Sequence, residues 1–150
     1  VWLKASAPEG WQLRPDVELI SGSFYDGWRT SFSPGFAWNV SRHLELGANY
    51  ELSVIRFPDR DLKFNAHLPR IRIQTALNRH FSAFSFVQYN NQIDKVSVNT
   101  RLRYHFKEGR DLWIVYNEGL NSNRPRIQSP RLPVTDSRTL LLKYTHTFAL

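Results

Sequence analysis

The five histidines are the residues of this sequence best suited to acid–base catalysis or metal binding, because the chain contains no cysteine. Four lie in predicted turns or near predicted strand ends, where a hydrogen-bonding role is expected: His43, His80, His105 and His146. His67 alone lies close to an acidic segment, at Asp59 and Asp61. A hydrolase site would require a histidine beside a carboxylate or a serine, and no spacing in this sequence specifies such a group. The sequence therefore predicts no catalytic residue, no metal site, no cofactor and no enzymatic activity.

Charged side chains alternate with apolar ones along most of the chain, so that both signs of charge occupy the same parity, opposite to the apolar one. Because buried charges must be paired, the acidic and basic members of that parity are expected to form one network across a narrow polar interior. The predicted network consists of Arg14, Glu18, Glu45, Glu51, Arg70, Arg72, Arg101 and Arg103. The alternative is a soluble barrel, in which the same charges face outward and the apolar parity fills the interior.

Strict alternation between turn signals predicts an all-β fold, with no segment of helical period. Eight strands are expected: Trp11 to Tyr25, Trp28 to Val40, Leu44 to Ile55, Lys63 to Leu77, Phe81 to Asn90, Lys95 to Phe106, Asp111 to Glu118, and Thr139 to Leu150. Asp26-Gly27 predicts a two-residue hairpin turn, and Pro69 predicts a bulge. Residues 1–150 form one domain, with 1–10 as an N-terminal lead-in and 119–138 as a long outer loop.

The short second, fourth and sixth connections are typical of the periplasmic turns of a bacterial outer-membrane barrel. We therefore expect an eight-stranded antiparallel up-and-down transmembrane β-barrel, whose even strand number places both chain ends at the periplasm. Aromatic residues near the strand ends are expected to form two girdles at the lipid headgroups. These girdle residues are Trp11, Tyr25, Trp28, Trp38, Phe81, Tyr89, Phe106, Tyr116 and Phe148.

Composition excludes several other classes. Mean hydropathy is −0.45, and no apolar run approaches the roughly 20 residues of a transmembrane helix. The net charge of +7 is dispersed along the chain, which argues against nucleic acid as a partner. Methionine is absent even at position 1, so we expect a mature or truncated chain whose signal peptide has been removed. Arg124, Arg126 and Arg131 of the last loop are candidate contacts for lipopolysaccharide phosphates.

One stretch carries a family resemblance. The run FVQYNNQIDKVSVNTRLRYHFKEGRDLWIVYNEG, Phe86 to Gly119, resembles the C-terminal region of a little-characterised family of bacterial outer-membrane proteins. Its most specific part is RLRYHFKEGRDLWIVYNEG. In that family a module resembling a family 9 carbohydrate-binding domain precedes a C-terminal β-barrel. The resemblance implies a barrel in the outer membrane, without a catalytic set. Since members of the family are much longer, this chain is expected to lack the sugar-binding-like module and some strands.

The resulting expectation is an integral outer-membrane protein of a Gram-negative bacterium, with a structural or anchoring role. An interior of about eight strands is just wide enough for side chains to fill it. Its expected partners are the lipid bilayer, lipopolysaccharide and, during insertion, the barrel-assembly machinery. Two alternatives stay open: a pore, or the C-terminal part of a larger transport barrel, and a soluble lipocalin-like binding protein.

Overall fold

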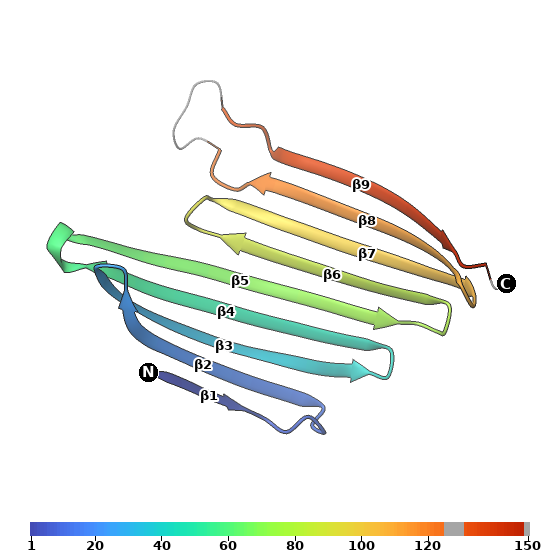
Figure 1. Cartoon of the computed structure of the whole chain (residues 1–150), viewed down its shortest axis with the longest axis horizontal. Coiled ribbons are helices and arrows are strands. Elements are labelled where there is room, and N and C mark those ends of the chain that lie inside the picture. Colours follow the sequence, from blue (N-terminus) through green and yellow to red (C-terminus); the bar gives the residue numbers. More distant parts are fainter. Residues whose placement is uncertain (125–130, 149–150) are drawn as a thin grey trace.

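The chain folds into one antiparallel sheet of nine strands, which follow one another in sequence order (Figure 1). The computed structural model describes residues 1–124 and 131–148. Its strands are β1 Trp2–Ser6, β2 Leu13–Phe24, β3 Gly27–Ser41, β4 Leu44–Phe57, β5 Leu62–Ala76, β6 Phe81–Asn90, β7 Lys95–Lys107, β8 Arg110–Asn121 and β9 Thr135–His146. A single 3-10 turn, η1 Pro58–Arg60, precedes β5. This arrangement confirms the all-β, antiparallel, up-and-down prediction.

The predicted number of strands is wrong, because the segment expected to be a lead-in contains β1. Trp2 pairs with Ile20 and Ser6 with Asp16, so β1 extends the sheet beyond β2. Five residues are too few for alternation to stand out in the sequence. The odd strand number also places the start of β1 and the end of β9 at opposite ends of the sheet, contrary to the prediction (Figure 1).

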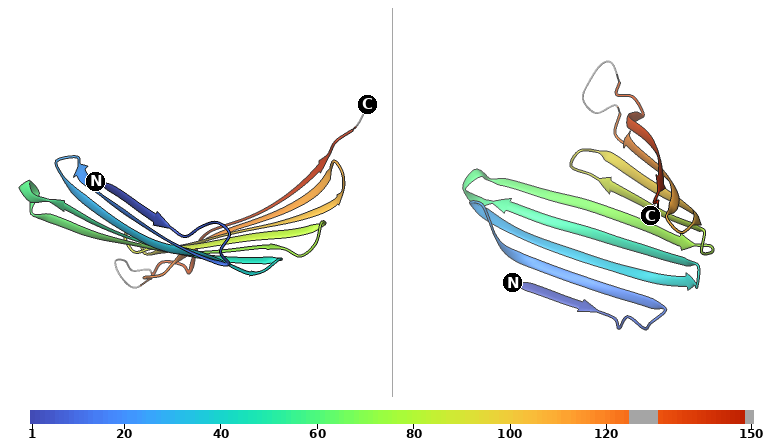
Figure 2. Two further views of the ribbon diagram at one scale, coloured as in Figure 1. Left: turned by 90° about the horizontal axis from the view of Figure 1, so that it is seen from below. Right: turned by 45° about the vertical axis from the view of Figure 1, so that its right-hand side comes forward.

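The sheet is open, so the prediction of a closed barrel is wrong for the chain as described. β1 and β9 are its two edges and do not pair with each other. The sheet is strongly twisted and curved, and its strand ends rise out of the mean plane (Figure 2). Alternation specifies that neighbouring strands pair, but it carries no information on whether the first strand meets the last. Among the described residues, no helix is long and apolar enough to cross a membrane.

The two ends of the sheet differ in their connections. At one end, called here the turn end, short turns join β3 to β4, β5 to β6 and β7 to β8. At the other, called the loop end, lie the tight β2–β3 turn and the connections 58–61, 91–94 and 122–134. The last connection is shorter than predicted at both ends, because β8 continues to Asn121 and β9 begins at Thr135. β9 ends at His146, whereas the predicted strand ran on to Leu150, which lies outside the described residues.

The β2–β3 turn lies one residue earlier than predicted. Phe24 pairs with Gly27, so the two turn residues are Tyr25 and Asp26, and Tyr25 has a φ of 53°. Gly27 is needed for another reason. A Cβ at this position would collide with the carbonyl oxygen of Arg56 and lie 2.7 Å from the Phe57 ring. The glycine therefore permits close approach of β4 and does not provide the turn conformation.

Residues paired across antiparallel strands share a face, so the register separates two faces. One, the apolar face, carries the apolar parity, as shown by the series Trp38, Leu46, Ile73. The other, the polar face, carries the charged parity, as shown by Arg14, Ala37, Gly47, Arg72. The register runs without interruption through Pro69, so the bulge predicted there is wrong and Leu68 stays on the polar face.

The exposure of the two faces is inverted relative to a soluble protein. No apolar side chain is buried within residues 1–124 and 131–148. On the apolar face Ile71 is 54% and Leu142 71% exposed, whereas the Glu51 side chain on the polar face is only 18% exposed. This part of the chain therefore has no hydrophobic core, and its polar side chains are the more enclosed.

Candidate functional site

The polar face carries a network of ion pairs centred on β4. Glu45 accepts from Arg14 of β2 at 2.7 Å and from Arg72 of β5 at 3.4 Å, so one carboxylate joins three strands. Arg14 has to reach across β3, where its neighbour on the polar face is the small residue Ala37. Gly47 leaves room for the guanidinium group, since an added Cβ would lie 3.2 Å from an Arg72 nitrogen. The small residues of β3 and β4 thus make the network sterically possible.

A second bridge lies six residues along β4, on the same face. Glu51 accepts from Arg29 of β3 at 3.2 Å and from Arg70 of β5 at 3.0 Å. Arg29 also donates to Ser31 at 2.8 Å, and the Ser31 and Ser53 hydroxyls lie 2.8 Å apart as the two most buried side chains described. Hydrogen bonds to every charged group in the bridge offset the cost of its partial burial.

A separate cluster occupies the turn end of the polar face on β7 and β8. The Asp111 carboxylate accepts from Arg103 and from His105, both at 2.9 Å. The Arg103 guanidinium group lies 5.3 Å from the centre of the Trp113 ring, in cation–π geometry. Arg101, two residues away, donates to Asn99 at 3.1 Å and pairs with no carboxylate among the described residues. One arginine is thus neutralised, and its neighbour keeps its charge uncompensated.

The predicted eight-residue network is therefore divided. Five members form the two bridges on β4: Arg14, Glu45, Glu51, Arg70 and Arg72. Glu18 instead accepts from the Trp2 indole nitrogen at 2.6 Å. The pairs join strands that are adjacent in the sheet or, for Arg14 and Glu45, one strand apart, and they do not cross an interior. Sequence reasoning missed Arg29 and Asp111 as partners, although the shared parity of these residues with the network was the signal that could have identified them.

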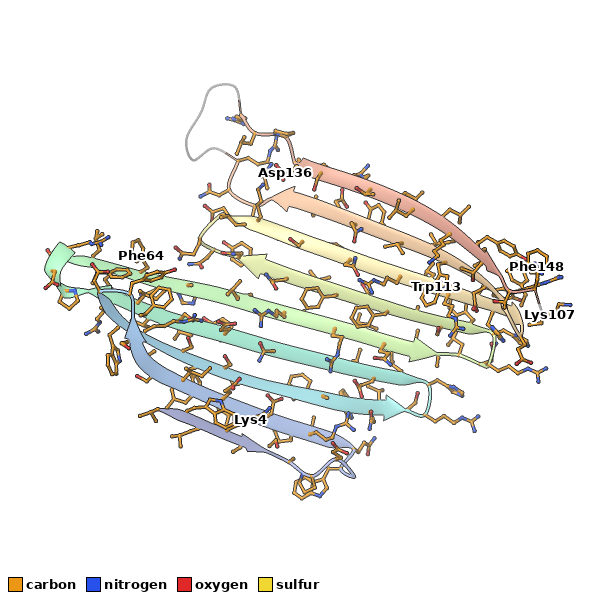
Figure 3. The ribbon with its side chains drawn as sticks, viewed as in Figure 1. Lys4, Phe64, Lys107, Trp113, Asp136 and Phe148 are labelled. Carbon is orange, nitrogen blue, oxygen red and sulfur yellow. The ribbon has the colours of Figure 1, made fainter. Side chains whose placement is uncertain are left out.

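Aromatic rings interrupt the polar face at two places. Phe84 pairs in register with Arg101, and Phe86 with Arg72 and Asn99, so both rings lie among the charges of β5 and β7. At the loop end, three rings form a cluster in which Phe57 contacts both Phe24 and Phe64, with ring centroids 6.4 and 6.1 Å apart. Figure 3 shows this end of the sheet, with Phe64 labelled. The polar face therefore offers apolar contact surface as well as charge.

The predicted girdle residues occupy different kinds of position. Five are on the apolar face within strands: Trp28, Trp38, Phe81, Tyr89 and Tyr116. Tyr116 lies in the middle of β8 and not at its outer end. Trp11 and Tyr25 lie in connections. At the turn end, a series of ring contacts runs through Tyr104, Phe106, Tyr144, His146 and Phe148, with centroids 4.3 to 6.4 Å apart. Figure 3 shows Phe148 at this end of the sheet, where Lys107 also lies.

The apolar face carries charged side chains near the loop end: Arg56 and Lys63, which pair in register on β4 and β5, and a cluster on β8 and β9. Glu118 pairs in register with Arg138, which donates to it at 3.1 Å through Nε, and Tyr116 donates to the same carboxylate at 2.6 Å. The Glu118 side chain is 13% exposed. A paired, hydrogen-bonded charge three residues from the strand end is compatible with the headgroup level of a bilayer, where such groups are tolerated.

The histidines serve the turns and the sheet. His43 and His80 each bond through Nδ1 to a carbonyl of the next turn, Ala76 O at 2.8 Å and His105 O at 2.7 Å. Each ring also accepts at Nε2 from the preceding arginine, which fixes the Nδ1–H tautomer. His67 contacts the Tyr50 hydroxyl at 2.5 Å. Within the described ranges no group of three or more His, Asp or Glu side chains could hold a metal ion.

The three arginines proposed for lipopolysaccharide lie in or beside the last loop. Arg124 donates to the Leu132 carbonyl at 2.9 Å, which ties one side of the loop to the other. Arg131 is exposed, and Arg126 lies outside the described residues.

Comparison with known protein families, with curated proteins and with solved structures finds no match for this chain. The family resemblance of Phe86 to Gly119 therefore stays a prediction.

Proposed function

We propose that this sheet is part of the wall of a β-barrel in the outer membrane of a Gram-negative bacterium, with the apolar face on lipid and the polar face on a water-containing interior. The function proposed is that of a membrane channel wall without catalytic activity. Lipid, lipopolysaccharide at the loop end and the insertion machinery are its proposed partners.

The inverted exposure of the two faces is the observation that carries this proposal. Leucine, isoleucine or aromatic side chains of the apolar face are exposed on every described strand except β6 and β8, which in water would form a larger apolar surface than a soluble monomer presents. On the opposite face, the carboxylates of Glu45 and Glu51 are partly enclosed, and each is paired with two arginines. A bilayer outside and water inside would stabilise both faces at once.

The open edges favour a barrel larger than the eight-stranded, side-chain-filled one expected from the sequence. β9 is a strand of 12 residues whose outer edge has no backbone partner among the described residues. In hydrocarbon each unpaired backbone group costs several kcal/mol, so both edges must be completed by further strands. A wall of nine strands plus its completing strands encloses more space than side chains alone would fill. A transport barrel therefore fits these edges better than a plugged anchor.

Three consecutive leucines provide the test. Leu140, Leu141 and Leu142 are all exposed, but the register places Leu140 and Leu142 on the apolar face and Leu141 on the polar face with Arg101 and Val115. Because the chain has no cysteine, each leucine can be replaced singly by cysteine and labelled with an environment-sensitive fluorophore. The protein is then refolded into lipid vesicles.

Brominated lipids should quench the labels at 140 and 142, and iodide in the buffer should quench the label at 141. The three positions share residue type and strand, so each serves as a control for the others. Equal quenching at all three sites by iodide would contradict the proposal, and so would a folded protein that stays in solution without detergent, as a lipocalin-like protein would.

A further inference from the structure

We infer that the polar face around Arg101 and Arg103 binds a small organic anion that carries a flat apolar group, of the chemical class of aromatic carboxylates. This inference deepens the proposed function, since a solute reaches this face only if the face borders water.

The site is a hollow of about 350 Å³ at the turn end of the polar face, across β5 to β8. Its polar-face side chains come from four adjacent strands: Gln74, Ser82, Phe84, Arg101, Arg103 and Trp113. The volume lies within the range of about 300 to 1,000 Å³ that small-molecule sites occupy. The hollow therefore has the size for one small organic solute.

Register places the two arginines between two rings. Arg101 pairs with Phe84 on the β6 side, and Arg103 pairs with Trp113 on the β8 side. Residues two apart on a strand share a face and lie about 7 Å from each other. A carboxylate held by one guanidinium group is thus within reach of an aromatic ring on either flank. This combination of planar donors and aromatic surface recognises an anion joined to a flat apolar body.

The two arginines differ in how far neighbouring groups compensate their charge. Arg103 is held by Asp111 at 2.9 Å and lies over Trp113 at 5.3 Å, so its position is fixed and its charge neutralised. Arg101 is bonded through Nε to the neutral Asn99, so its two terminal nitrogens have no partner within the described chain. It is also exposed, and it has no carboxylate partner among the described residues, whereas each arginine in the Glu45 and Glu51 bridges has one. Arg101 is therefore the anchor for the ligand carboxylate.

Binding of 2-naphthoate to the full chain refolded in detergent micelles tests this inference, with uptake by protein-free micelles subtracted. Arg101→Gln should weaken binding about tenfold or more, the loss expected for one charge-assisted hydrogen bond. Phe84→Leu keeps an apolar side chain but removes the ring, and should weaken binding several-fold. Lys4→Gln is the matched control, because Lys4 is on the same face at the far edge strand (Figure 3) and loses the same charge.

Two further probes separate the parts of the site. Neutral 2-naphthol, which keeps the ring, and acetate, which keeps the charge, should each bind at least tenfold more weakly than 2-naphthoate. Equal affinity of the Arg101→Gln and Lys4→Gln variants would overturn the inference, as would equal affinity for 2-naphthoate and 2-naphthol. If the labels at positions 140, 141 and 142 are quenched as proposed but the protein binds no 2-naphthoate, this inference is overturned and the proposed function stands. Equal iodide quenching at all three positions would instead count against the proposed function.

Discussion

Replacing Glu51 by glutamine tests whether the polar face is sheltered from bulk water. The variant keeps the shape of the side chain and leaves the guanidinium groups of Arg29 and Arg70 without their shared carboxylate. Removing one partner of a fully buried pair costs about 3 to 5 kcal/mol, and an exposed pair contributes about 0 to 1 kcal/mol. The exposed fractions are 18% for Glu51, 38% for Arg29 and 33% for Arg70, between these limits. We therefore expect a loss of about 2 kcal/mol in the free energy of unfolding.

Equilibrium unfolding in urea, with the protein refolded in lipid vesicles, measures this loss. Asp136→Asn is the matched control, because its pair with Lys95 is short, at 2.6 Å, but 36% to 39% exposed at the loop end (Figure 3). The control should cost about 0.5 kcal/mol or less. A double-mutant cycle of Glu51→Gln with Arg70→Gln should give a coupling of about 1 kcal/mol. Equal losses for Glu51→Gln and Asp136→Asn would refute the reasoning, because both pairs would then be equally screened by solvent.

Three further predictions concern packing, turns and lipid contact. Gly27→Ala should destabilise the protein by about 1 to 3 kcal/mol, because the added Cβ meets the backbone of β4, whereas Gly22→Ala, with no atom within 4 Å, should change unfolding in urea by well under 1 kcal/mol. His80→Ala removes the hydrogen bond between adjacent turns and should cost about 1 kcal/mol in the same assay. Ile71→Arg on the apolar face should cost about 2 to 4 kcal/mol in vesicles, and Gln74→Arg on the polar face far less; equal costs would contradict the assignment of the faces.

The strands and faces of this protein were predictable from local pattern, because side-chain direction along a strand depends only on parity. β6 has the predicted bounds, Phe81–Asn90, and the charged side chains of β2 to β7 share one face except for Arg56 and Lys63 at the loop end. The predicted strands and turns were wrong where the alternating pattern is short or ambiguous. β1 is too brief to alternate visibly, and in the β2–β3 turn the glycine serves a contact with β4 that no local rule contains.

The partners within the polar face were less predictable. Parity placed Glu45 and Glu51 with the arginines, but which arginine each carboxylate binds depends on register and on the space that small residues leave. Arg101 and Arg103 have the same type and parity, yet only Arg103 pairs with a carboxylate among the described residues. Asp111 lies opposite His105, which is two residues from Arg103 but four from Arg101.

The sequence by itself determined an all-β chain with one apolar and one charged face, since both follow from a period of two residues. Only the tertiary structure decided that the nine described strands form an open sheet, that the ion pairs run along one face of it, and that Arg101 lies beside Phe84 without a carboxylate partner among the described residues. These features depend on contacts between residues far apart in the chain, and local periodicity does not encode them.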